Sequence, residues 1–126
     1  YIQRNAVQSE SRTHGFFYQP ESTLSGLLGL PIIGGDSQRP TAAEKYLRNK
    51  NLQLSDMGML TASNNSNLND NCQASCVDWY GNARPIFIGK RVYALMGYEL
   101  VEGRITGNDI IEQRRLNYAP QLQRNR

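Results

Sequence analysis

The sequence predicts an all-β fold built from antiparallel meanders, with one short helix near residues 41–50. Short runs of Ile, Val, Phe and Tyr alternate with clusters of Gly, Pro, Asn and Asp, which is typical of strands separated by turns. The strongest run, ARPIFIGKRVYALMGYELVEGRI at 83–105, predicts two strands joined by a glycine turn. Only residues 41–50 combine a helix-start signal with good helix formers.

Composition indicates one water-soluble domain or a piece of a larger protein. The chain has 126 residues, of which 39% are hydrophobic, and a net charge of +3. Its apolar runs are too short to span a bilayer, so no transmembrane segment is expected. Its basic residues are not interleaved with aromatic ones, so no nucleic-acid partner is expected. Because the chain begins with Tyr1 and lacks a signal-peptide pattern, we expect a processed product or a C-terminal fragment.

The first third of the chain predicts an irregular start at 1–13 and a hairpin at 14–33. The aromatic run FFY favours a strand. The sequence QPES after it supplies turn residues, and a second apolar run follows. Pro31 in that run has no N–H, so it is expected at a sheet edge or a strand end.

Residues 34–56 are expected to form a loop and then a helix. Thr41 and Glu44 have the spacing of a capping box, with Thr41 as the N-cap and Glu44 at the third helical position. The helix is expected to end near Asn49 or Asn51 and to decorate a β scaffold.

Residues 57–82 are expected to form a short strand, within DMGMLTAS, and a long loop rich in Asn and Cys. The loop holds both cysteines of the chain, in the spacing CxxxC. This spacing fits neither a zinc site nor a thioredoxin motif. We predict a disulfide between Cys72 and Cys76 rather than free thiols, which implies an oxidising compartment.

Residues 83–120 are expected to form a meander of three or four antiparallel strands, followed by a tail at 121–126. The runs IFI and VYAL are apolar on both faces of the pleat. Such strands are typical of a sheet that is covered on both sides.

The quoted stretch at 83–105, together with IIEQRRLNYAP, resembles the C-terminal end of secreted bacterial β-propellers, a family distantly related to WD-40 repeats. HGFFYQPESTLSGLLGLPI is similar to an element of the preceding blade. The resemblance covers 14–33 and 83–120 and implies one or two blades. Propellers close with about four to eight blades, so the chain would need the remainder of its parent propeller, or copies of itself. The resemblance implies no catalytic residues.

Aromatic side chains are the candidate interaction residues. Trp79 and Tyr80 beside the cysteine loop, with Tyr93 and Tyr98 in the meander, are candidates for contact with protein or carbohydrate. The alternative for each is packing in the core.

The Asn-rich loop is the metal candidate of the chain, because calcium prefers oxygen ligands. The oxygen atoms would come from Asn65, Asn67, Asn69 and Asp70. Only Asp70 is charged and no closing Glu follows, so a surface loop without metal is favoured, and no cofactor is expected.

No catalytic motif is present. His14 is the sole histidine, and a hydrolase would need it in a pocket with Asp56, Asp70 or Asp78. Glu99 and Glu102 are three residues apart on a strand, so their side chains point to opposite faces. They are expected to be solvated or paired with Arg91 and Arg104.

The sequence therefore predicts a non-catalytic segment that is secreted, periplasmic or at the bacterial cell surface. It would bind protein, or assemble with itself, through strand edges and apolar sheet faces. The alternative is part of a propeller-type hydrolase or lyase whose catalytic groups lie mostly outside this chain.

Overall fold

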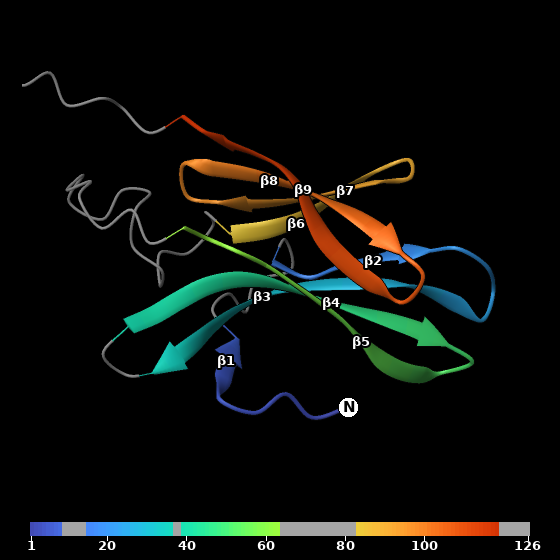
Figure 1. Cartoon of the computed structure of the whole chain (residues 1–126). Coiled ribbons are helices and arrows are strands. Elements are labelled where there is room, and N and C mark those ends of the chain that lie inside the picture. Colours follow the sequence, from blue (N-terminus) through green and yellow to red (C-terminus); the bar gives the residue numbers. More distant parts are fainter. Residues whose placement is uncertain (9–14, 37–38, 64–82, 119–126) are drawn as a thin grey trace, which may run out of the picture.

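The computed structural model describes residues 1–8, 15–36, 39–63 and 83–118, and shows an all-β chain (Figure 1). The described strands are β1 (Ala6–Gln8), β2 (Phe17–Pro20), β3 (Ser25–Asp36), β4 (Arg39–Lys50), β5 (Gln53–Thr61), β6 (Ala83–Ile88), β7 (Arg91–Met96), β8 (Glu99–Thr106) and β9 (Asp109–Asn117). They form two antiparallel sheets, here called sheet A (β1–β5) and sheet B (β6–β9). The sheets lie one over the other (Figure 1).

Sheet A has the order β1-β3-β4-β5, with β2 beside β1 on the same edge of β3. β2 and β3 form the predicted hairpin, in which Phe17 pairs with Gly29 and Pro20 with Gly26. β1 then pairs with the far end of β3, so part of the segment expected to be irregular is a short strand.

Pro31 lies between the segments of β3 that pair with β2 and with β1. No described residue pairs with Leu30 or Pro31 on this edge. The other edge of β3 is paired with β4 along its whole length. Pro31 thus lies at a position on this edge where no described strand is added, in keeping with its expected edge position.

The predicted helix at 41–50 is wrong, because these residues belong to β4. This strand pairs with β3 on one side and with β5 on the other. Residues 42–47 are all buried, which suits a strand whose two faces are both covered rather than an exposed helix on a β scaffold. An isolated helix of this length is only marginally stable in water, so pairing on both edges overrides the local helix preference.

Sheet B is the predicted meander, with the order β6-β7-β8-β9. Each of its three hairpin turns contains a glycine with positive φ, namely Gly89, Gly97 and Gly107. Residues with side chains adopt this conformation at a cost, so glycine suits these turns. A bulge opposite Glu102 and Gly103 shifts the register between β8 and β9.

The hydrophobic core lies between the two sheets. Its buried members are Leu27, Tyr46, Met57, Leu60, Val92, Ala94, Met96, Val101 and Ile110. Tyr46 is the largest of them, and its ring meets Phe87 of sheet B edge-on at 6.1 Å. Its hydroxyl donates a hydrogen bond of 2.9 Å to the carbonyl of Tyr93, so the polar end of the ring is also satisfied.

The strand expected within DMGMLTAS is present as β5, which begins earlier, at Gln53. The Asn- and Cys-rich loop that the sequence predicts after this strand lies, over residues 64–82, outside the described residues, as does the predicted tail at 121–126. The disulfide between Cys72 and Cys76 therefore stays a prediction.

The close approach of the sheets at Gly29 gives a stability test. A Cβ at this position would lie 2.5 Å from Cβ of Pro85, so Gly29→Ala forces the sheets apart. We expect a loss of about 1–3 kcal/mol in the free energy of unfolding, measured by chemical denaturation. Gly34→Ala is the control, because its nearest heavy atom would be 3.9 Å away. Equal stabilities of the two variants would contradict the packing at Gly29.

Candidate functional site

The face of sheet B that points away from sheet A is the main candidate surface, here called the outer face. Along β7, Val92, Ala94 and Met96 are buried in the core. Because side chains alternate along a strand, Tyr93 and Leu95 point to the outer face. In the described part of the chain, no element packs over this face (Figure 1).

Apolar side chains form a continuous row across the outer face. The strand register places Leu95 beside Leu100, and Leu100 beside Leu116. The first two are half-buried, and Leu116 is 56% exposed on β9. On the first strand of the sheet, Ile88 is 62% exposed on the same face. The outer face thus combines a half-buried apolar centre with exposed apolar side chains at its margins.

Arginines lie at the β6 end of this apolar row and along one side of it. By the strand register and the alternation of side chains, the outer face carries Arg84, Arg91, Arg104 and Arg114. The cross-strand rows of paired residues that contain these arginines include one carboxylate, that of Glu102. Arg91 donates a hydrogen bond of 2.9 Å to it, which holds the pKa of Glu102 below its usual value. The Arg91 guanidinium also lies 5.4 Å from the ring centre of Tyr93, a cation–π distance.

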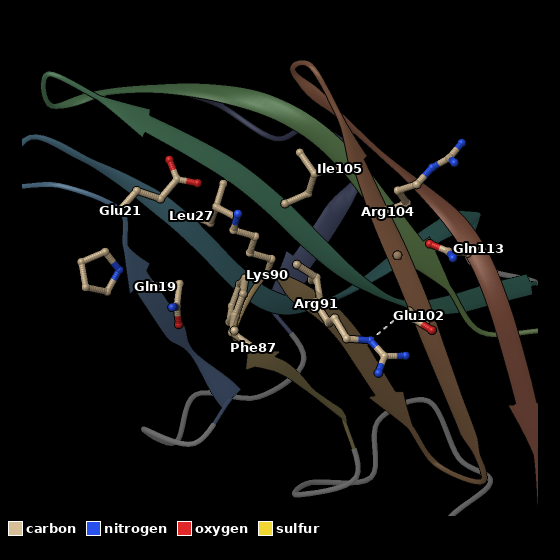
Figure 2. A pocket seen from close by; sticks show the side chains of 14 residues that line it. Gln19, Glu21, Leu27, Phe87, Lys90, Arg91, Glu102, Arg104, Ile105 and Gln113 are labelled. Atoms are coloured by element: carbon tan, nitrogen blue, oxygen red, sulfur yellow. Dashed lines mark hydrogen bonds and ion pairs between the residues drawn. The ribbon is translucent and has the colours of Figure 1, made fainter.

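A groove of about 550 Å³ opens where the β2–β3 hairpin meets the β6–β7 turn (Figure 2). Its apolar lining comes from Pro20, Leu27, Phe87, Val92 and Ile105. Its polar and charged lining comes from Gln19, Glu21, Lys90, Arg91, Glu102, Arg104 and Gln113. Figure 2 shows Lys90 extending toward the space between Leu27 and Ile105.

The charges at the groove do not cancel. Glu102 pairs with Arg91, and Glu21 pairs with Arg48 at 3.0 Å, so both carboxylates are already matched. Lys90 and Arg104 form no ion pair with any described residue. The groove therefore presents two unmatched positive charges above an apolar floor.

The structure places the two described aromatic candidates in different environments. Tyr93 is half-buried on the outer face, beside Arg91. Tyr98 lies in the β7–β8 turn, and its ring meets that of Tyr118 edge-on at 6.5 Å. Tyr93 thus lies within the outer face, whereas Tyr98 lies with Tyr118 at the end of the β8–β9 ladder.

Several predicted site residues lie outside the part of the chain that the structure describes. They are His14, Asn65, Asn67, Asn69, Asp70, Cys72, Cys76, Asp78, Trp79 and Tyr80. Among the described residues, no group of three or more His, Cys, Asp or Glu side chains is placed to hold a metal ion. In those same ranges no helix is long and apolar enough to cross a membrane.

Sequence reasoning missed the buried carboxyl of Glu44, which it placed in the first turn of a helix. On β4, Glu44 lies beside Pro31 and Leu60 on the face that meets the core, with no exposed surface. No described residue forms a hydrogen bond with either of its side-chain oxygens. Burial raises the pKa of Glu44 well above its usual value, and burial together with the Glu44 charge raises the pKa of Tyr46.

Lys45, the next residue, is buried on the opposite face of sheet A. Its ammonium lies 2.6 Å from the carboxylate of Asp56 and 5.6 Å from the ring centre of Tyr1. Partial burial pulls the pKa of Asp56 upward, but hydrogen bonds from Lys45 and from the Gly58 N–H outweigh it and lower the pKa. Asp56 is thus engaged in a structural pair on β5.

Glu99 and Glu102 point to opposite faces, as expected from their spacing. Glu102 has the expected partner Arg91, whereas Glu99 pairs with Arg115 at 3.2 Å. Glu99 also accepts hydrogen bonds from the N–H and the hydroxyl of Ser63, and Arg115 donates one of 2.7 Å to the carbonyl of Thr61. These contacts tie the last strands of sheets A and B together.

The raised pKa of Glu44 gives a pH prediction. The folded state binds the Glu44 proton more tightly than the unfolded state, whose pKa is near 4.5. This tighter proton binding therefore stabilises the native chain below pH 4.5. The stabilisation is lost as the pH rises toward the folded-state pKa of Glu44. We expect Glu44→Gln to raise the free energy of unfolding by about 1–3 kcal/mol at alkaline pH, and the gain to shrink toward acidic pH.

Denaturation curves of both proteins across the pH range measure this difference. Glu112→Gln is the control, because its hydrogen bond from Arg115 lowers the pKa of Glu112, so the sign of its pH dependence is reversed. A gain for Glu44→Gln that is independent of pH would contradict the buried, unpartnered carboxyl.

The contact between Arg115 and Glu99 gives a second stability prediction. Arg115→Met leaves the carboxylate of Glu99 buried without its cation, so we expect a loss of about 2–3 kcal/mol in thermal or chemical unfolding. Its neighbour Arg114 is exposed on the outer face, and Arg114→Met should change stability by less than about 0.5 kcal/mol. Similar losses for the two variants would show that Arg115 does not hold the sheets together.

Comparison with protein-family models, with curated proteins and with solved structures finds no match to this chain. The outer face and the groove are thus the features of the described residues from which a function is inferred.

Proposed function

We propose that this chain is a non-catalytic β domain that binds another protein through the outer face of sheet B. The observation that supports this most directly is the apolar row of Leu95, Leu100 and Leu116, which no described element covers. Protein interfaces combine an apolar centre with a polar rim and are enriched in Arg and Tyr. The outer face has this composition, with Tyr93 beside the row and arginines around it.

The charge of the outer face favours an acidic partner over a second copy of the chain. Packing two outer faces together would oppose the arginines of one copy with those of the other, and like charges brought together cost several kcal/mol. A partner with carboxylates around an apolar centre would match both the row and the arginines. Self-assembly through this face is therefore the less favourable alternative.

The strand edges are less suited to binding than the outer face. β6, at one edge of sheet B, contains Pro85, which cannot donate to an added strand. β9, at the other edge, lies against β5, and a Cβ on Gly58 would come within 3.4 Å of the Ile110 carbonyl. Both features limit the addition of a further strand to sheet B.

A place for the chain within a β-propeller is part of this proposal. The support is the four-stranded antiparallel meander of β6 to β9, since a propeller blade is a sheet of four strands. In that setting the partner surface would belong to the remainder of the parent propeller, in a secreted, periplasmic or surface protein. A mass shift on reduction would test the Cys72–Cys76 disulfide that such a location implies.

The double variant Leu100→Ser/Leu116→Ser tests the outer face. The immobilised chain captures its partner from an extract of the source cells, and the purified partner is then titrated calorimetrically. We expect at least a tenfold loss of affinity, because the row lies at the centre of the interface. The control is Leu52→Ser/Leu54→Ser, which removes two exposed leucines of sheet A and should leave the affinity unchanged.

Unchanged affinity of the first variant would contradict the proposal. So would a chain that binds only itself in light scattering, or one that binds only single-stranded oligonucleotides through its arginines.

A further inference from the structure

The groove beside the outer face has an apolar floor that is already fixed in place. Leu27 and Val92 belong to the buried core, and Phe87 and Ile105 pack against that core. Phe87 is further held by the ring of Phe17, whose centre lies 5.5 Å away. A ligand would therefore meet a floor that needs little ordering, which lowers the cost of binding.

The groove and the outer face are continuous. Arg91, Glu102 and Arg104 point to the outer face by the strand register, and they also line the groove (Figure 2). A partner that covers the apolar row of the outer face would reach the groove by extending along β8. The groove is open to solvent along one side, which suits a segment of chain that passes through it more than an enclosed small molecule.

From these contacts we propose that the groove binds an acidic, apolar peptide segment of the partner protein. An apolar side chain of the segment lies on Leu27, Phe87 and Ile105, and its carboxylates pair with Lys90 and Arg104. The two carboxylates of the groove are engaged by Arg91 and Arg48, so they leave these two cations unmatched. This inference rests on the proposed function, because it identifies one segment of the partner at the edge of the same surface.

The test is a titration of the isotope-labelled chain, followed by NMR, with a synthetic peptide of alternating Glu and Phe, about eight residues long. We expect the amide signals of Lys90, Arg104 and Ile105 to shift, with a dissociation constant of about 1 mM or tighter. A peptide of alternating Lys and Phe has the same apolar content and should leave these signals unshifted. Added salt should weaken the binding of the Glu peptide, because the ion pairs of its carboxylates with Lys90 and Arg104 are exposed to solvent.

Variants separate the groove from the rest of the surface. Lys90→Glu/Arg104→Glu should weaken the binding of the Glu peptide at least fivefold. Arg4→Glu/Lys50→Glu makes the same change in net charge with exposed residues that belong neither to the groove nor to the outer face, and should weaken the binding of the Glu peptide less than twofold. The spread of amide signals in each spectrum reports whether the variant is folded.

Three outcomes would overturn the inference. Absence of shifts at the groove would exclude an acidic segment there. Decanoate that shifts the same signals as strongly as the peptide would identify a site for small amphipathic anions instead. Shifts confined to Leu95, Leu100 and Leu116 would leave the proposed function standing while the groove inference fails. Loss of partner binding in the outer-face variants is measured separately, so the two proposals can fail independently.

Discussion

The packing of Tyr46 against sheet B determines how the two sheets meet, and the rest of the structure depends on it. Tyr46 lies on β4, a strand of sheet A that is paired on both edges along most of its length. Its ring fills the space left by Gly29 on the neighbouring strand, and its hydroxyl reaches a backbone carbonyl of sheet B. Because a buried hydroxyl needs a partner, this bond fixes the position of β7 over β4 as well as filling the core. The outer face exists in its present orientation because β7 is held there.

Much of the fold could be predicted from the sequence, since turn chemistry and strand composition are local signals. The glycines of the meander, and the residues QPES of the first hairpin, mark turns by their own conformational preferences. The segment around Glu44 and Tyr46 could not be predicted, because its local spacing indicates a helix while its burial is decided by two strands elsewhere in the chain. The pairing of the two sheets is likewise a long-range property.

The candidate site was predictable only in outline. The apolar residues of VYAL on both faces of the pleat predicted a sheet that is covered on both sides, whereas the described residues cover one side alone, and Tyr93 was among the candidates. The arginines around it come from four different strands, so no run of sequence brings them together. Lys90 and Arg104 were not recognised as a pair for the same reason. A search for basic residues at alternate positions in each strand of the meander would have found the arginines, but not Lys90, which lies in the β6–β7 turn.

The gap beside Pro31 has a consequence for how this molecule survives at high concentration. The long strand β3 is covered on that edge by two short strands, with an interruption between them. A continuous edge of that length would be a template on which other chains could stack into fibrils. Among the described residues, β1 and β2 are short, and Pro31, opposite neither of them, has no N–H to donate to an added strand. We therefore expect this edge of the sheet to be a poor template for fibril growth.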